Sequence, residues 1–154
     1  MLKIGGLQLG YGTEKNDEIS LNIYVSGCLN NKSCKRHECH NKELQDFNCG
    51  KHWTEYLTEI DVIIKSSLID CIIFLGGEPL DQNVFEFLKL IKIIKNRYPF
   101  LKIYSYTGYN YIDKKDMILY YKNYYQFDDI CFGHYNMYTQ KTWLSGMEGA
   151  TVCI

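Results

Sequence analysis

Three cysteines that could bind a metal lie close together in the chain, at Cys28, Cys34 and Cys39. They follow a short β-prone apolar run, Leu21–Val25, which ends at Ser26-Gly27. We expect no signal peptide, and clustered cysteines in a reducing compartment indicate metal or redox chemistry rather than structural disulfides. We therefore predict a metal-cluster loop over residues 27–52, at the C-terminal end of a strand.

Two metal centres fit this loop. Three thiolates with no fourth cysteine beside them suit an iron–sulfur cluster that keeps one iron open. A structural zinc site needs four protein ligands, and the set could be completed by Cys49, His37, His40 or His52. Reactive or buried thiols are a third interpretation. The spacing of the cysteines alone leaves these alternatives open.

A second motif, Gly76-Gly77-Glu78-Pro79, follows the apolar run Cys71–Leu75. Two glycines at a strand end let the backbone approach a ligand closely, and the glutamate adds a negative charge. The same residues also suit an ordinary strand-to-helix turn, because a glutamate near a helix N-terminus is favoured by the helix dipole. The motif is common by itself, but its combination with a tri-cysteine loop after an earlier strand is much rarer.

The elements that must position these motifs alternate along the chain. Apolar runs predict strands over residues 21–25, 71–75, 101–106 and 129–132, and helical periodicity predicts helices over residues 54–65, 83–98 and 113–121. Residues 1–20 are glycine-rich and are expected to form an irregular N-terminal arm. Residues 137–154 form a variable tail, with a last strand expected over residues 151–154.

Alternating strands and helices predict an α/β fold with a mainly parallel sheet and right-handed crossovers. The βα units are too few for a closed eight-stranded barrel, so we expect an open, partial barrel. In such sheets the ligand site lies at the C-terminal ends of the strands. The cysteine loop, the Gly-Gly-Glu-Pro turn and Thr107-Gly108 all fall at that edge.

Composition sets limits on partners and location. The chain has 154 residues, which indicates a single domain over residues 1–154. Its net charge of −1 gives no electrostatic case for nucleic acid or for an anionic membrane surface. No apolar run approaches the roughly 20 residues of a membrane span. We expect a cytoplasmic protein.

The two motifs and their order resemble the radical S-adenosylmethionine (SAM) superfamily. Within it, the chain is similar to the small activating proteins of anaerobic (class III) ribonucleotide reductases. The resemblance covers about residues 20–136 and is carried by the segments at residues 24–28, 39–43, 46–50, 76–80, 106–109 and 133–135. The chain departs from the family in its longer cysteine spacing, since five residues (Leu29 to Ser33) and four residues (Lys35 to Glu38) replace the usual three and two. Both longer arms can still close on one cluster, because loop-closure entropy grows slowly with length.

The resemblance implies a specific set of cofactor contacts. Three irons of a [4Fe–4S] cluster would be held by Cys28, Cys34 and Cys39, and SAM would bind the fourth iron. The residues implied to line the SAM site are Gly76, Gly77 and Glu78 at the methionyl amino group, Glu38 and His40 at the nucleoside, and Thr107 and Gly108 at the next strand end.

The implied reaction is reductive cleavage of SAM to methionine and a 5′-deoxyadenosyl radical, which abstracts a hydrogen atom from a glycine of a partner anaerobic ribonucleotide reductase. A flavodoxin- or ferredoxin-like protein would supply the electron. Three alternatives remain: another glycyl radical enzyme as partner, another protein or peptide substrate, or a zinc-stabilised α/β binding module without turnover.

Several further residues are expected to be structural. Cys71 and Cys131 lie inside apolar runs and are predicted to be buried, while Cys49 is predicted to be a loop thiol. His37 and His52 are expected to be solvated. The tyrosines at positions 120, 121, 124 and 125 are expected to pack, and Trp53 and Trp143 to anchor the loop and the tail.

Overall fold

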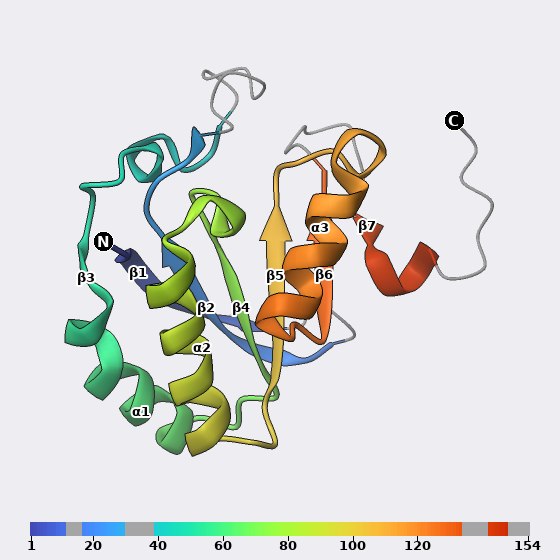
Figure 1. Ribbon diagram of the computed structural model, residues 1–154. Helices are drawn as coiled ribbons and strands as arrows, with labels where there is room; N and C mark the ends of the chain where they lie inside the picture. The colour runs from blue at the N-terminus through green and yellow to red at the C-terminus, as the bar shows by residue number, and fades with distance from the viewer. Residues whose placement is uncertain (12–16, 30–38, 134–141, 148–154) are drawn as a thin grey trace.

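The computed structural model describes residues 1–11, 17–29, 39–133 and 142–147. In this part of the chain, one sheet carries three α-helices (Figure 1). The strands are β1 (Lys3–Tyr11), β2 (Ile19–Val25), β3 (Lys51–His52), β4 (Cys71–Gly76), β5 (Lys102–Thr107), β6 (Asp129–Phe132) and β7 (Thr142–Trp143). The α-helices are α1 (Leu57–Ser66), α2 (Val84–Arg97) and α3 (Tyr111–Tyr125). Short 3-10 helices are η3 (Lys42–Gln45), η4 (Trp53–Tyr56), η5 (Pro79–Asp81) and η6 (Leu144–Met147).

The four strands predicted from apolar runs form the parallel centre of the sheet. The strand order is β3-β1-β2-β4-β5-β6-β7, and β2, β4, β5 and β6 pair in parallel. Val25 lies opposite Gly76, and Thr107 lies opposite Phe132. The C-terminal ends of these strands therefore meet at one edge, as the sequence predicted for an α/β fold with a mainly parallel sheet.

The prediction of an irregular arm over residues 1–20 is wrong. Within it, Lys3–Tyr11 form β1, which pairs antiparallel with β2 and with β3. Glycines disfavour strands in general, but here they allow close contacts: a Cβ on Gly5 would lie 2.2 Å from the Leu44 side chain. Leu2 and Ile4 are fully buried. Because glycine is uncommon in strands, the sequence did not predict this strand, although the side chain of Ile4 is part of the core.

The tail adds a second antiparallel edge. β7 pairs with β6, and the Trp143 ring packs edge-on against Tyr104, as expected of an anchor. The strand predicted over residues 151–154 lies outside the described residues. At the other end of the cluster loop, Trp53 is also buried, again as expected.

Capping explains where the helices begin. The Asn83 side chain accepts a hydrogen bond from the Glu86 backbone and starts α2, and the Asn110 side chain does the same for α3 through Ile112. α3 is longer than predicted at both ends. α1 starts three residues later than the predicted start at Thr54, because residues 53–56 form η4. No helix in the described part of the chain has the length and apolarity needed to cross a membrane.

The main core lies between the helices and one face of the sheet. Phe87 of α2 is fully buried and its ring lies 4.9 Å from that of Phe74 on β4 and 4.8 Å from that of Tyr125 on α3. The other face carries a smaller cluster that includes Cys71, Ile73 and Tyr104. Burial raises the pKa of the Cys71 thiol to about 12. Cys71 and Cys131 are both fully buried, as predicted.

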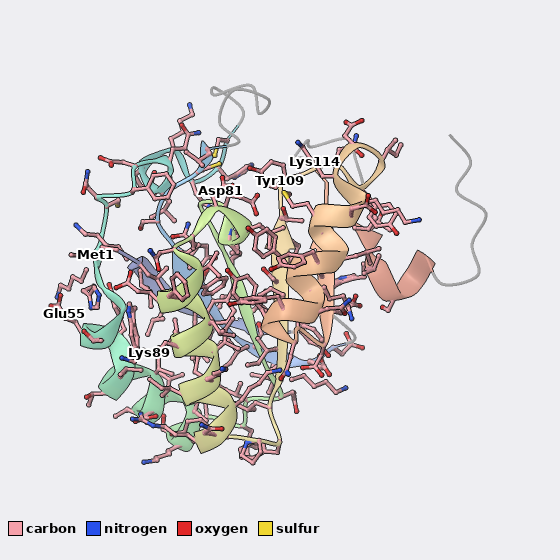
Figure 2. All side chains as sticks on the ribbon, in the orientation of Figure 1. Met1, Glu55, Asp81, Lys89, Tyr109 and Lys114 are labelled. Carbon is pink, nitrogen blue, oxygen red and sulfur yellow. The ribbon has the colours of Figure 1, made fainter. Side chains whose placement is uncertain are left out.

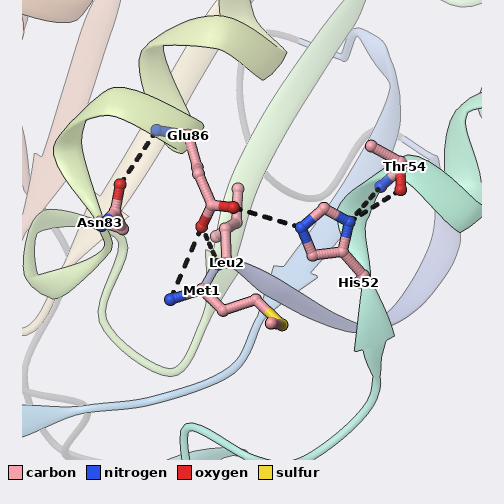
Figure 3. A network of polar contacts seen from close by, with 6 residues as sticks. All are labelled: Met1, Leu2, His52, Thr54, Asn83 and Glu86. Carbon is pink, nitrogen blue, oxygen red and sulfur yellow. Dashed lines mark hydrogen bonds and ion pairs between the residues drawn. The ribbon is translucent and has the colours of Figure 1, made fainter.

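The first residues of the chain are joined to α2 by the Glu86 carboxylate (Figure 3). Glu86 accepts a hydrogen bond from the Leu2 backbone and lies 3.6 Å from the Met1 amino group. Its other oxygen is 3.2 Å from His52 Nε2, and His52 Nδ1 is 2.7 Å from the Thr54 hydroxyl. The His52 side chain is 29% exposed, so it is only partly solvated, and its ring links β3 and η4 to α2.

We expect Phe87→Ala to lower the free energy of unfolding by about 3–5 kcal/mol, because it removes a ring from the centre of the core. Phe85→Ala, on the same helix, is the matched control, since that side chain is 81% exposed. Urea unfolding of both variants measures the difference. Similar losses from the two variants would contradict this description of the core.

Candidate functional site

The site is organised by backbone contacts between the ends of β2 and β4. The Gly77 amide donates to the Val25 carbonyl and the Glu78 amide donates to the Gly27 carbonyl, each at 2.8 Å. The Gly27 amide donates at 2.8 Å to the Leu44 carbonyl in η3. The segment that leads into Cys28 is thus held between the end of β4 and η3.

Gly77 is required by this packing. A Cβ at that position would lie 2.4 Å from the Gly27 carbonyl oxygen and 2.8 Å from the Leu44 carbonyl oxygen. Gly27 itself has φ +107, and a Cβ there would lie 2.0 Å from the Phe47 ring. The sequence predicted that the glycines let a ligand approach. In the structure they have a packing reason of their own, because three chain segments meet where side chains would be.

The Glu78 carboxyl joins two strand ends. It is 1% exposed, and its oxygens accept hydrogen bonds from the Leu80 amide at 3.1 Å and the Gly108 amide at 2.7 Å. Burial raises the pKa of Glu78 to about 8, although hydrogen bonds from Gly108, Leu80 and the Thr107 side chain act in the opposite direction. Glu78 also caps η5, which agrees with the interpretation of the motif as a strand-to-helix turn.

Thr107 lies at the matching end of β5. It is 3% exposed, and its hydroxyl oxygen accepts a hydrogen bond from the Tyr109 amide at 3.2 Å. The Thr-Gly segment therefore turns directly beside the Glu78 carboxyl. The structure brings together the two strand ends that the sequence placed at one site.

The two described cysteines of the predicted ligand set both adjoin this turn. Cys28 directly follows Gly27 and donates its amide to the Gln45 carbonyl at 3.2 Å. Cys39 lies two residues before Asn41, whose side chain donates to the Gly76 carbonyl at 3.4 Å. Both cysteines are partly exposed, and His40 is exposed. The described chain before Cys28 and the described chain after Cys39 therefore both contact the Gly-Gly-Glu turn.

The remaining members of the predicted set, Cys34 and Glu38, lie outside the described residues, as does His37. Within the described ranges no group of three His, Cys, Asp or Glu side chains could hold a metal ion. Cys49 is partly exposed in the loop, as expected of a loop thiol. The two described donors, Cys28 and Cys39, fit an iron–sulfur cluster in their chemistry, because they are partly exposed cysteines and thiolates are the usual ligands of such a cluster.

Sequence reasoning missed Asp81 and Gln82, which follow the turn directly. Asp81 accepts hydrogen bonds from the Leu29 amide and the Tyr109 hydroxyl, each at 2.6 Å. Gln82 is buried and donates to the Gly27 carbonyl at 3.1 Å and the Glu78 carbonyl at 3.0 Å. Their position beside the turn was the only signal, since the contacted loop residues lie more than 50 positions away in sequence.

Comparison with known proteins gives a family match over most of the chain. Residues 10–143 match the 4Fe-4S single cluster domain. The chain is 31% identical over 127 residues to the "Anaerobic ribonucleoside-triphosphate reductase-activating protein" of Enterobacteria phage T4, covering 79% of this chain and 75% of that relative. No solved structure matches the chain.

We expect the ligand-free chain to lose stability through Glu78 as the pH rises from about 4.5 to about 8. The pKa of this carboxyl is 4.5 ordinarily and about 8 in the folded chain, so the folded state keeps a proton that the unfolded state releases. The loss should be on the order of a few kcal/mol across this window.

Urea unfolding at pH 5 and pH 8 measures this effect. Glu78→Gln should remove the Glu78 part of the slope, whereas Glu55→Gln, at an exposed position of η4, should keep it. The same slope in the Glu78→Gln variant and in the unmodified chain would refute the assignment.

Proposed function

Because the chain belongs to the family of anaerobic ribonucleoside-triphosphate reductase-activating proteins with a 4Fe-4S single cluster domain, we propose that it is a radical SAM activating enzyme. Its substrate would be a glycine of a partner anaerobic ribonucleotide reductase. The observation that supports this most strongly is that Gly27, next to Cys28, and Asn41, two residues after Cys39, both bond the turn at residues 76–78.

In this proposal the thiolates of Cys28, Cys34 and Cys39 hold three irons of a [4Fe–4S] cluster. When bound and reduced, such a cluster would supply the electron for reductive cleavage of SAM to methionine and a 5′-deoxyadenosyl radical, and this radical would take a hydrogen atom from the partner's glycine. A flavodoxin- or ferredoxin-like protein would be the electron donor.

The SAM ammonium would be recognised by polar groups at the end of β4. The candidates are the backbone at Gly76 and Gly77 and the carboxyl of Glu78, with Thr107 at the neighbouring strand end. Glu78 already accepts two backbone hydrogen bonds, so its main contribution would be to keep the two strand ends in register. A cation beside it would also favour its ionised form. Glu38 and His40 are proposed to lie near the nucleoside.

The proposal includes the open partial barrel expected from the sequence. The three helices contribute to the core on one face of the sheet, while a tyrosine-rich face carrying Tyr104 and Tyr106 lies opposite. In a partial barrel, that opposite face would be the interior and would receive the substrate segment. The edge with the cysteine arms would then lie at its mouth.

Anaerobic reconstitution tests the proposal. We expect a brown protein with about four irons per chain, which releases 5′-deoxyadenosine when dithionite and SAM are added. With an anaerobic ribonucleotide reductase present, a glycyl radical signal should appear in the electron paramagnetic resonance spectrum.

Two substitutions make the test specific. Cys39→Ala should lose the iron, whereas Cys71→Ala should keep it, because Cys71 is buried in β4 away from the loop. A colourless protein with one zinc ion per chain and no SAM cleavage would overturn the proposal and favour a zinc-stabilised binding module.

A further inference from the structure

Asp81 connects three segments at the candidate site. Its Oδ2 accepts the Leu29 amide at 2.6 Å, and its Oδ1 accepts the Tyr109 hydroxyl at 2.6 Å. Figure 2 shows Asp81 and Tyr109 close together where β4 and β5 end. Tyr109, which follows β5, holds one oxygen of the Asp81 side chain. The other oxygen holds the Leu29 amide, and because Leu29 directly follows Cys28, this contact fixes the chain just after the cysteine.

The chain just before Cys28 is fixed by the same short turn. The Gly27 carbonyl accepts both the Glu78 amide at 2.8 Å and the Gln82 side chain at 3.1 Å. Residues 78–82 therefore hold the peptide groups on both sides of Cys28. These contacts fix the backbone of Cys28, so the position of its sulfur is left to the choice among side-chain rotamers.

Asp81 also brings a carboxylate close to this cysteine. The side chain is half-buried, so its field is screened less by solvent than that of a surface carboxylate. Hydrogen bonds to cluster sulfurs, net charge and solvent exposure all set the potential of an iron–sulfur centre. The contact at Leu29 acts in the same direction as the charge, because an N–H that donates to the carboxylate is not free to donate to a cluster sulfur.

We propose that Asp81, oriented by Tyr109, is a positioning residue that fixes the Cys28 arm of the cluster loop and lowers the reduction potential of the centre bound there. The inference rests on the proposed function. Burial raises the pKa of the Tyr109 hydroxyl above its ordinary value, and its hydrogen bond to Asp81 acts in the same direction. The phenol therefore stays a hydrogen-bond donor to the carboxylate at neutral pH.

Asp81→Asn tests the charge while it keeps the shape of the side chain. In the reconstituted protein, a redox titration followed by electron paramagnetic resonance should give a less negative potential than that of the unmodified chain. Asp116→Asn is the matched control, because Asp116 is exposed on α3 and its loss should leave the potential unchanged. An unchanged potential in Asp81→Asn, or an equal shift in both variants, would overturn the tuning role.

Hydrogen exchange tests the positioning without reference to activity. In Asp81→Ala the Leu29 amide should exchange about tenfold faster or more, since it loses a hydrogen bond to a charged group. Tyr109→Phe should also speed up exchange of the Leu29 amide. The reduction potential of the reconstituted Tyr109→Phe variant should stay closer to that of the unmodified chain, because the carboxylate remains. Unchanged exchange at Leu29 in both variants would refute the inference.

The two readouts separate this inference from the proposed function. If the unmodified chain takes up no iron–sulfur cluster, the proposed function and the tuning role both fail, and the exchange data alone decide whether Asp81 positions the loop. If the reconstituted chain cleaves SAM while Asp81→Asn leaves the potential unchanged and Asp81→Ala leaves exchange at Leu29 unchanged, the proposed function stands and the inference fails.

Discussion

The close approach of the backbone at Gly27 to the backbone at Gly77 is the constraint on which the site depends. The Gly27 carbonyl accepts hydrogen bonds from the Glu78 amide and the Gln82 side chain, and its amide donates to Leu44. A Cβ on Gly77 would lie 2.4 Å from the Gly27 oxygen. This contact joins the end of β2, the end of β4 and η3, and so determines where the cysteine loop leaves the sheet.

Two carboxyl groups connect this turn to the end of β5. Glu78 accepts a hydrogen bond from the Gly108 amide, and Asp81 accepts one from the Tyr109 hydroxyl. Burying Glu78 is unfavourable for its charged form, as its raised pKa indicates. A site that recognises an ammonium group would offset this penalty. The same arrangement thus serves the fold and suits the proposed binding of SAM.

The sequence predicted the parallel centre of the sheet because a continuous apolar run such as Cys71–Leu75 is typical of a strand that is buried on both faces. It failed at β1, where glycines that permit close packing resembled a loop. From their chemistry and order it predicted that Cys28, Cys39 and the Gly-Gly-Glu turn belong to one site, and the structure shows that Gly27 and Asn41 contact this turn. It could not find Asp81 or Gln82, because the loop residues that they contact, Leu29 and Gly27, lie more than 50 positions away and only the fold brings them together.

The central claim is that the glycine contact between β2 and β4 holds the cysteine loop where it can bind its cluster. Iron content after anaerobic reconstitution tests this most directly in Gly77→Ala, with Gly6→Ala as control, because a Cβ at Gly6 meets no atom within 4 Å. Circular dichroism verifies that both variants are folded. The account predicts that Gly77→Ala binds far less iron than the unmodified chain while Gly6→Ala binds as much. Full iron binding by a folded Gly77→Ala variant would contradict it.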